Sequence, residues 1–132
     1  MKDRTINILF LIAMAGLFVY FSYVRGWIFV NYTSISAKQA HILLQRDDNV
    51  TLLDVRSNGE YQRGHIRGAI LIPVESLEKE ISKLDKFKKR QIIVYCQTGS
   101  RSVRASRILV KHGFMPLNLK DGFKVWKKEN IN

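Results

Sequence analysis

The only cysteine of the chain lies in a segment whose residue types suit a reactive thiol. Cys96 follows the apolar run 92–95 (IIVY), and the polar, small and cationic residues QTGSR come directly after it. Gly99 permits a turn with positive φ, and a helix that begins near Arg101 would point its first N–H groups at that turn. Arg101 and Arg104 add positive charge. Because all of these features favour a thiolate over a thiol, we expect Cys96 to have a lowered pKa and to be nucleophilic.

A second interpretation makes Cys96 a structural thiol at the end of a buried strand, which is where free cysteines often pack. The residues that follow Cys96 would form a poor core, however, because they are polar and cationic. The same residues suit the binding of an anion. We therefore favour the reactive thiol.

Short apolar runs alternate with helical patterns along most of the chain. The apolar runs are typical of strands buried on both faces, and they cover residues 50–55, 69–72, 92–95 and 117–119. A further short strand, the first in the chain, is expected around residues 34–35. The helical patterns start after Ser36, cover 74–84 and 101–112, and resume near Gly122. This alternation predicts an α/β domain with a mainly parallel sheet and helices on both faces. Cys96 then lies at the carboxyl end of a strand, where ligands bind in open α/β sheets.

Three local signals refine the helices. Ser36 is a candidate N-cap for a helix whose apolar residues fall on one face, and Gly113 is a candidate left-handed residue at the end of the helix 101–112. His41 lies beside the apolar face of its helix, where we expect a half-buried structural imidazole. Trp126 is expected to be a core anchor.

The N-terminal segment predicts a transmembrane helix. Residues 6–24 carry no charge over 19 positions, which at 1.5 Å per residue is about 28 Å, close to the thickness of the bilayer core. Tyr20, Tyr23 and Trp27 gather at its C-terminal end, where aromatic rings favour the membrane interface. We therefore expect a membrane anchor over residues 1–30 and a soluble domain over residues 31–132.

A cleaved signal peptide is the alternative, with Lys2 and Arg4 as its charged start. The apolar stretch is longer than a signal peptide usually needs, and the bulky residues 27–30 follow it in place of a small-residue cleavage site. An uncleaved anchor fits better.

The formal net charge of +11 lies mostly in the soluble part. Scattered basic residues suit nearness to anionic lipid or solubility, and no nucleic-acid-binding motif accompanies them. The three histidines, His41, His65 and His112, are far apart in the sequence and there is no pair of cysteines, so we expect no metal site.

The cysteine segment resembles the active-site loop of rhodanese-like domains, whose pattern is Cys, two residues, Gly, one residue, then Arg or Thr. Further motifs of that family follow in order along the chain: Leu53-Asp54-Val55-Arg56, Glu60-Tyr61, residues 64–69 (GHIRGA), Ile72-Pro73, and Asp121-Gly122 with Trp126. Asp121 stands where the family has the first of two glycines. The resemblance covers residues 36–126, and the whole arrangement is similar to small bacterial membrane-anchored rhodanese-like proteins.

The resemblance implies a thiosulfate sulfurtransferase-like enzyme that needs no cofactor. Cys96 would take a sulfane sulfur from thiosulfate or a persulfide donor, hold it as a persulfide, and pass it to a thiol or protein acceptor. Ser102 would add a hydroxyl, and Arg101 a positive charge. The backbone N–H groups that would line the persulfide belong to Gln97, Thr98, Gly99, Ser100 and Arg101.

Four residues of the other motifs have weaker claims to the site, and we expect Asp54, Arg56, Glu60 and His65 to support it structurally. Asp54 follows a buried strand and could accept backbone hydrogen bonds from neighbouring loops. Arg56 and Glu60 have the i,i+4 spacing of a helical ion pair. His65 lies in a turn between glycines.

Two other functions compete with sulfur transfer. A phosphatase or arsenate reductase of related fold needs five residues between its Cys and Arg, whereas four separate Cys96 from Arg101. A binding module without catalysis is the other alternative, although such adaptor domains usually lack the cysteine that is present here. The resemblance implies a protein of the bacterial inner membrane. A persulfide survives best in a reducing compartment, so we expect the domain to face the cytoplasm.

Overall fold

A computed structural model describes residues 2–24 and 32–131, and the chain divides into two compact units, Met1–Val30 and Asn31–Asn132. The described part of the first unit is the helix α1 (Lys2–Val24). Within it, the 20 residues Arg4–Tyr23 are long and apolar enough to cross a membrane, a property that signal sequences share. Large apolar side chains are exposed all around this helix, unlike in an amphipathic surface helix. Arg25 and the predicted interface residue Trp27 lie outside the described residues.

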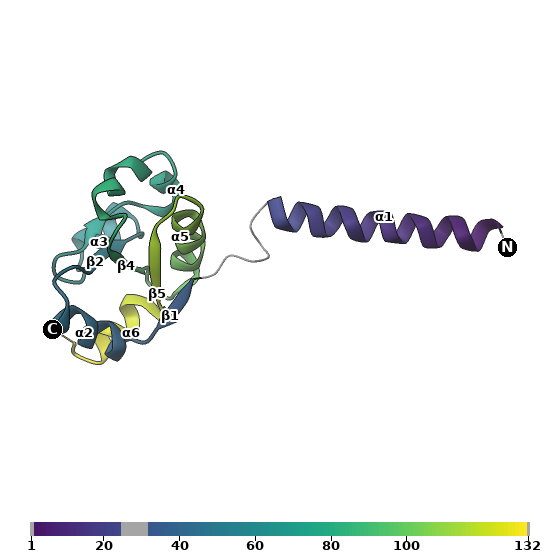
Figure 1. The fold of residues 1–132 in the computed structure, drawn as a ribbon. Coiled ribbons are helices and arrows are strands. Elements are labelled where there is room, and N and C mark those ends of the chain that lie inside the picture. Colours follow the sequence, from purple (N-terminus) through teal and green to yellow (C-terminus); the bar gives the residue numbers. More distant parts are fainter. Residues whose placement is uncertain (1, 25–31, 132) are drawn as a thin grey trace. The chain divides into compact units, whose positions relative to one another are not determined.

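The second unit is built on a parallel sheet of five strands, as the alternation of apolar runs predicted (Figure 1). Its order is β1-β5-β4-β2-β3, and every neighbouring pair is parallel. The strands are β1 (Thr33–Ile35), β2 (Thr51–Asp54), β3 (Ile70–Leu71), β4 (Gln91–Tyr95) and β5 (Met115–Leu119). The carboxyl ends of β2 and β4 are neighbours, because Asp54 is in register with Tyr95.

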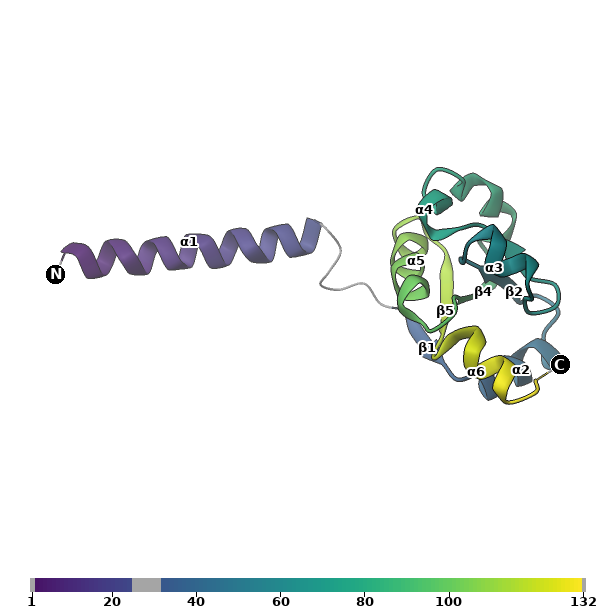
Figure 2. The same ribbon diagram turned by 180° about the vertical axis from the view of Figure 1, so that it is seen from behind.

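Helices cover both faces of this sheet (Figures 1 and 2). Each face has its own apolar core. On one face pack α4 (Val74–Leu77), the 3₁₀ helix η1 (Ile81–Phe87) and α5 (Ser100–Lys111). On the other pack α2 (Ala37–Arg46), α6 (Gly122–Lys128) and the segment that precedes β3. The remaining short helix, α3 (Asn58–Gln62), follows β2.

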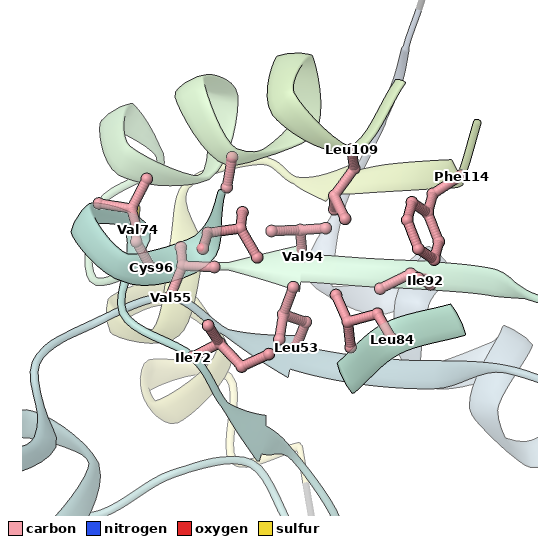
Figure 3. Packing of buried hydrophobic residues seen from close by; sticks show 12 residues of the cluster. Leu53, Val55, Ile72, Val74, Leu84, Ile92, Val94, Cys96, Leu109 and Phe114 are labelled. Atoms are coloured by element: carbon pink, nitrogen blue, oxygen red, sulfur yellow. The ribbon is translucent and has the colours of Figure 1, made fainter. Parts of the chain in front are cut away.

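The alternation of side chains along β4 assigns neighbouring residues to opposite cores. Ile92, Val94 and Cys96 belong to the core under α5, whereas Ile93 and Tyr95 belong to the core under α2 and α6. Figure 3 shows Cys96 at the end of this strand, beside Val74 and beneath α5. Tyr95, the last residue of β4, and Cys96, which follows it, therefore pack on opposite faces of the sheet.

Local signals account for most helix ends. Ser36 caps α2, with its hydroxyl accepting a hydrogen bond from the N–H of Gln39, and Gly113 takes a φ of 82° after α5. The helical pattern over residues 74–84 does not form one helix, however. It divides into α4 and η1 after Leu77, although Leu77 and Leu84 are both buried as the spacing predicted.

Candidate active site

Cys96 lies just after β4, and its sulfur faces backbone N–H groups. The side chain is 1% exposed, and Sγ accepts a hydrogen bond of 3.0 Å from the N–H of Gly99. Gly99 has the predicted positive φ, at 109°, and is the N-cap of α5. Ser102 Oγ lies 3.7 Å from the sulfur and donates a hydrogen bond to the carbonyl of Gly99. The sulfur thus lies where the free N–H groups of a helix start converge.

Two opposing influences determine the charge of this thiol. Burial is the largest single influence on the pKa of Cys96 and raises it. The N–H groups of Ser102, Gly99 and Thr98 and the neighbouring hydroxyl of Ser102 act against burial and outweigh it. The hydroxyl donates to the carbonyl of Gly99 in this arrangement and can rotate to donate to a thiolate. The pKa of Cys96 is therefore below its usual value, so more of the nucleophilic thiolate is present than in an unperturbed cysteine.

The start of α6 holds the cysteine loop from behind. The N–H of Phe123 donates to the carbonyl of Cys96 at 2.8 Å, and the N–H of Lys124 donates to the carbonyl of Gln97 at 3.1 Å. Gly122 makes this approach possible, since a Cβ at this position would lie 2.6 Å from both carbonyl oxygens. Asp121 and Gly122 both take a positive φ there, at 65° and 67°. The carbonyls of Cys96 and Gln97 are therefore both hydrogen-bonded to α6.

Arg56 joins the end of β2 to the cysteine loop. Its guanidinium is 2% exposed and forms an ion pair of 2.6 Å with the fully buried Asp54. It also donates to the carbonyl of Gly64 at 2.7 Å and to the side-chain oxygen of Gln97 at 3.2 Å. The ring of Phe123 lies under it, 4.4 Å from ring centre to guanidinium carbon. One buried cation therefore contacts four separate segments of the chain.

The predicted pairing of Arg56 with Glu60 is wrong, because each residue has a closer partner elsewhere. Arg56 pairs with Asp54, and Glu60 forms two hydrogen bonds of 2.8 Å with Arg101. The spacing suggested a helical pair, but Arg56 precedes α3, which begins only at Asn58. Glu60 also accepts from the N–H of Ser57 and so completes a capping box.

The pair between Glu60 and Arg101 lies beside the thiol. The hydrogen bond to Glu60 is the largest influence that raises the pKa of Arg101, and the charge of Cys96 raises it further. In return, Arg101 holds the pKa of Glu60 at about 2. Arg101 is thus positioned by a carboxylate while its charge acts on the sulfur.

The remaining residues predicted for the site lie at its margins. Ser100 begins α5 and is exposed, as is the side chain of Thr98. His65 stacks on the ring of Tyr61, with a centroid separation of 3.7 Å, and its Nδ1 lies 3.0 Å from the carbonyl of Tyr61. Within residues 32–131, His65 makes no hydrogen bond, ion pair or ring contact with Cys96 or with the loop that follows it.

Sequence reasoning gave no site role to Gly64, Tyr95 or Phe123. Gly64 supplies a carbonyl to Arg56, and the hydroxyl of Tyr95 accepts a hydrogen bond of 3.0 Å from the N–H of Ile66. The available signal was Asp121-Gly122 before a helical pattern, which marked a special turn. This signal did not indicate that the turn would lie against Cys96.

The family of this chain follows from comparison with known proteins. The family described as "Rhodanese-like domain" matches residues 36–129. The chain belongs to this family. The solved structure of a rhodanese-related protein from Thermoplasma volcanium superimposes with a TM-score of 0.70 at 28% identity, and the match covers 76% of this chain and 96% of that one. The resemblance inferred from the cysteine loop, and the α/β fold with it, are confirmed.

Relatives of known sequence point to the same chemistry. The thiosulfate sulfurtransferase GlpE of Coxiella burnetii is 33% identical over 97 residues, which are 73% of this chain and 88% of that protein. YqhL of Bacillus subtilis is 41% identical over 76 residues, or 57% of this chain. The chain spans 59% of YqhL and 43% of a further relative from that organism, YrkF. Membership of the family supports sulfur transfer as the general chemistry of this domain.

The close approach at Gly122 yields a first prediction. In Gly122→Ala the new methyl group meets two backbone oxygens and is held at a left-handed φ, so we expect the free energy of unfolding to fall by about 2–5 kcal/mol. Gly113→Ala is the matched control, because Gly113 has a similar φ of 82° and open space around it. That variant should lose only about 1–2 kcal/mol in urea unfolding. Equal losses would mean that contact with the cysteine loop is not what requires a glycine.

The hydrogen bonds at the sulfur yield a second prediction. Ser102→Ala should raise the pKa of Cys96, because it removes one of the groups that stabilise the thiolate. Thiolate absorbance in the ultraviolet, followed against pH, reports this single cysteine directly. Ser106→Ala is the control, since Ser106 lies on the same helix, is fully buried, and has a hydroxyl without a hydrogen-bond partner within the described chain. An unchanged pKa of Cys96 in Ser102→Ala would mean that the Ser102 hydroxyl does not stabilise the thiolate.

The lowered pKa of Glu60 yields a third prediction, for stability against pH. The carboxylate is favoured in the folded state, so its contribution to stability is complete above a pH of about 4.5 and is lost as the pH falls toward about 2. Glu60→Gln keeps the capping geometry but lacks this charge. The difference in unfolding free energy between wild type and Glu60→Gln should therefore shrink across that window. Glu129→Gln is the control for loss of a carboxylate as such, because Glu129 is exposed and has no ion pair within residues 32–131.

Proposed function

We propose that this protein is a sulfurtransferase in which Cys96 carries a sulfane sulfur as a persulfide. The observation that carries the proposal is the thiol of lowered pKa whose sulfur accepts the N–H of Gly99 at the start of α5. The same N–H groups that favour a thiolate would favour the terminal sulfur of a persulfide, which is also an anion. Neighbouring amides from Gln97 to Arg101 complete the candidate loop, with Ser102 behind it.

With thiosulfate as donor, the chemistry needs only the thiolate. The Cys96 thiolate attacks the outer sulfur of thiosulfate, a new S–S bond forms, and the bond to the sulfonate sulfur breaks so that sulfite leaves with the electron pair. An acceptor thiolate or cyanide then attacks the terminal sulfur of the persulfide, and the Cys96 thiolate is released. A general base is not required when the nucleophile reacts as a thiolate, and the lowered pKa of Cys96 favours that form. Arg101, held by Glu60, would attract the anionic donor.

The spacing of the loop favours a small anion over a phosphate ester. Four residues separate Cys96 from Arg101, and Gly99 already turns back onto the sulfur within three residues. The carbonyls behind the loop are fixed by α6, which limits how far the loop can widen. A single added sulfur atom suits such a loop better than a tetrahedral phosphate.

We also propose that α1 anchors the domain in a bacterial inner membrane, with the domain on the cytoplasmic side. The length and apolar character of Arg4–Tyr23 support the anchor. The need to keep a persulfide in a reducing compartment supports the cytoplasmic side. The expected partners are a small sulfur donor, a thiol or protein acceptor and the lipid bilayer.

Mass spectrometry tests the central claim. After thiosulfate treatment and gel filtration of the full chain, Cys96 should carry an adduct with the mass of one sulfur atom, and added cyanide should remove it. Cys96→Ser should show no adduct and no sulfur transfer, while it keeps its unfolding free energy to within about 1 kcal/mol. A wild-type thiol that stays unmodified with thiosulfate and with an organic persulfide would leave the binding module as the better interpretation. Unfolding of the serine variant would instead mean that the thiol is required for packing.

A further inference from the structure

A large cavity lies on the face of the sheet opposite to Cys96. Its volume is about 910 Å³, and its walls come from α2, α6 with the residues that follow it, the segment 63–67 and Leu52 of β2. Leu52, Ile66 and Trp126 belong to the core under α2 and α6, whereas Cys96 belongs to the other core. None of the residues 96–102 lines the cavity. It is therefore separate from the candidate active site.

The cavity combines an apolar floor with cations at its wall. Leu44, Leu52, Ile66, Phe123 and Trp126 provide apolar surface, which is the usual lining of a site for a small organic ligand, and the volume is within the usual range for such sites, about 300–1,000 Å³.

Three side chains add positive charge to this lining: Arg63, Arg67 and Lys127. Within the part of the chain that the structure describes, none of the three forms an ion pair. No aspartate or glutamate is among the described lining residues. By contrast, Arg56 and Arg101, the two arginines nearest the cysteine loop, are both paired with carboxylates.

Trp126 adds an unused hydrogen-bond donor. The residue is 6% exposed and lines the cavity, and its indole N–H forms no hydrogen bond within residues 32–131. This N–H is not among the buried polar atoms that lack a partner, so it is open to solvent and can donate to a molecule that enters the cavity. An acceptor oxygen supplied by a ligand would satisfy it.

We propose that this cavity binds a small organic anion with a flat apolar body and one acidic head group, such as a carboxylate, sulfonate or phosphate. The body packs against Phe123 and the aliphatic floor. The head group accepts hydrogen bonds from the free cations at the wall. This site is additional to sulfur transfer, and its ligand does not need to react.

A protein-observed titration tests the site. Naphthalenesulfonate is added to the full chain in nanodiscs of zwitterionic lipid, and the indole N–H signals are followed by NMR. Trp126→Phe identifies which of the two tryptophan signals belongs to the cavity. We expect that signal and the amide of Gly64 to shift and saturate. Methanesulfonate, which lacks the body, and naphthalenemethanol, which lacks the charge, should bind at least about tenfold more weakly.

Two neighbouring lysines on α6 supply the matched variants. Lys127 lines the cavity and Lys128 does not, although both are exposed and carry the same charge. Lys127→Glu should weaken naphthalenesulfonate binding by roughly fivefold or more, and Lys128→Glu by less than about twofold. Cys96→Ser should bind as wild type does, so the result is independent of sulfur transfer.

Several results would overturn the proposal. An unshifted Trp126 signal would exclude the cavity as a site for this ligand class. Equal binding of methanesulfonate would reduce it to an adventitious ion only. Equal weakening in the two lysine variants would mean that overall charge, and not the cavity, attracts the anion.

Discussion

The arrangement of this domain depends on the hydrogen bonds and the ion pair of the buried Arg56 guanidinium. A charge in the interior is tolerated only when it is paired and its N–H groups are used, and Asp54 meets that need directly after β2. The donors that remain reach the carbonyl of Gly64 and the side chain of Gln97. Because these groups belong to three segments far apart in sequence, satisfying one cation brings the cysteine loop, the segment before β3 and the end of β2 together. Phe123 adds α6 to the same junction through its ring.

This junction explains how a buried sulfur can be stabilised as an anion without a full positive charge bonded to it. The loop after Cys96 is held at its carbonyls by α6 and at the Gln97 side chain by Arg56, so its N–H groups are left for the sulfur. Arg101 is close enough for the charge of Cys96 to raise its pKa, yet its guanidinium is bonded to Glu60. Backbone dipoles that are fixed before a ligand arrives need no reorganisation, and this is the condition under which they stabilise charge best.

The outline of the fold could be predicted because it depends on local patterns. Apolar runs located β2, β3, β4 and β5, and β1 covers the residues where a short first strand was expected. The run 92–95 placed Cys96, which follows it, at the carboxyl end of a strand. Gly99 and Gly113 take the positive φ that their positions suggested. The helix predicted over 74–84 divides instead into α4 and η1, since the spacing of buried residues is compatible with either arrangement.

The pairing of charges could not be predicted in the same way, because it depends on contacts between distant segments. Arg56 and Glu60 had the spacing of a helical pair, but their partners were Asp54 at the end of a strand and Arg101 on another helix. The role of Gly122 depends likewise on the carbonyls of Cys96 and Gln97, which only the folded sheet brings near. Local sequence therefore predicts which element carries a charged site residue, whereas the tertiary fold decides which residue of opposite charge pairs with it.

Two adjacent residues at the end of β4 contribute to opposite faces of the sheet. Cys96 turns to the core under α5, while Tyr95, one position earlier, turns to the core under α2 and α6 and accepts the N–H of Ile66, which lines the cavity. Contacts that link the two sides include Arg56 between Gly64 and Gln97, and the N–H of Phe123 on the carbonyl of Cys96. Gly64 and Phe123 are themselves part of the cavity wall. A domain that stabilises an anionic sulfur on one face thus presents unpaired cations on the other, and the same buried arginine connects the two.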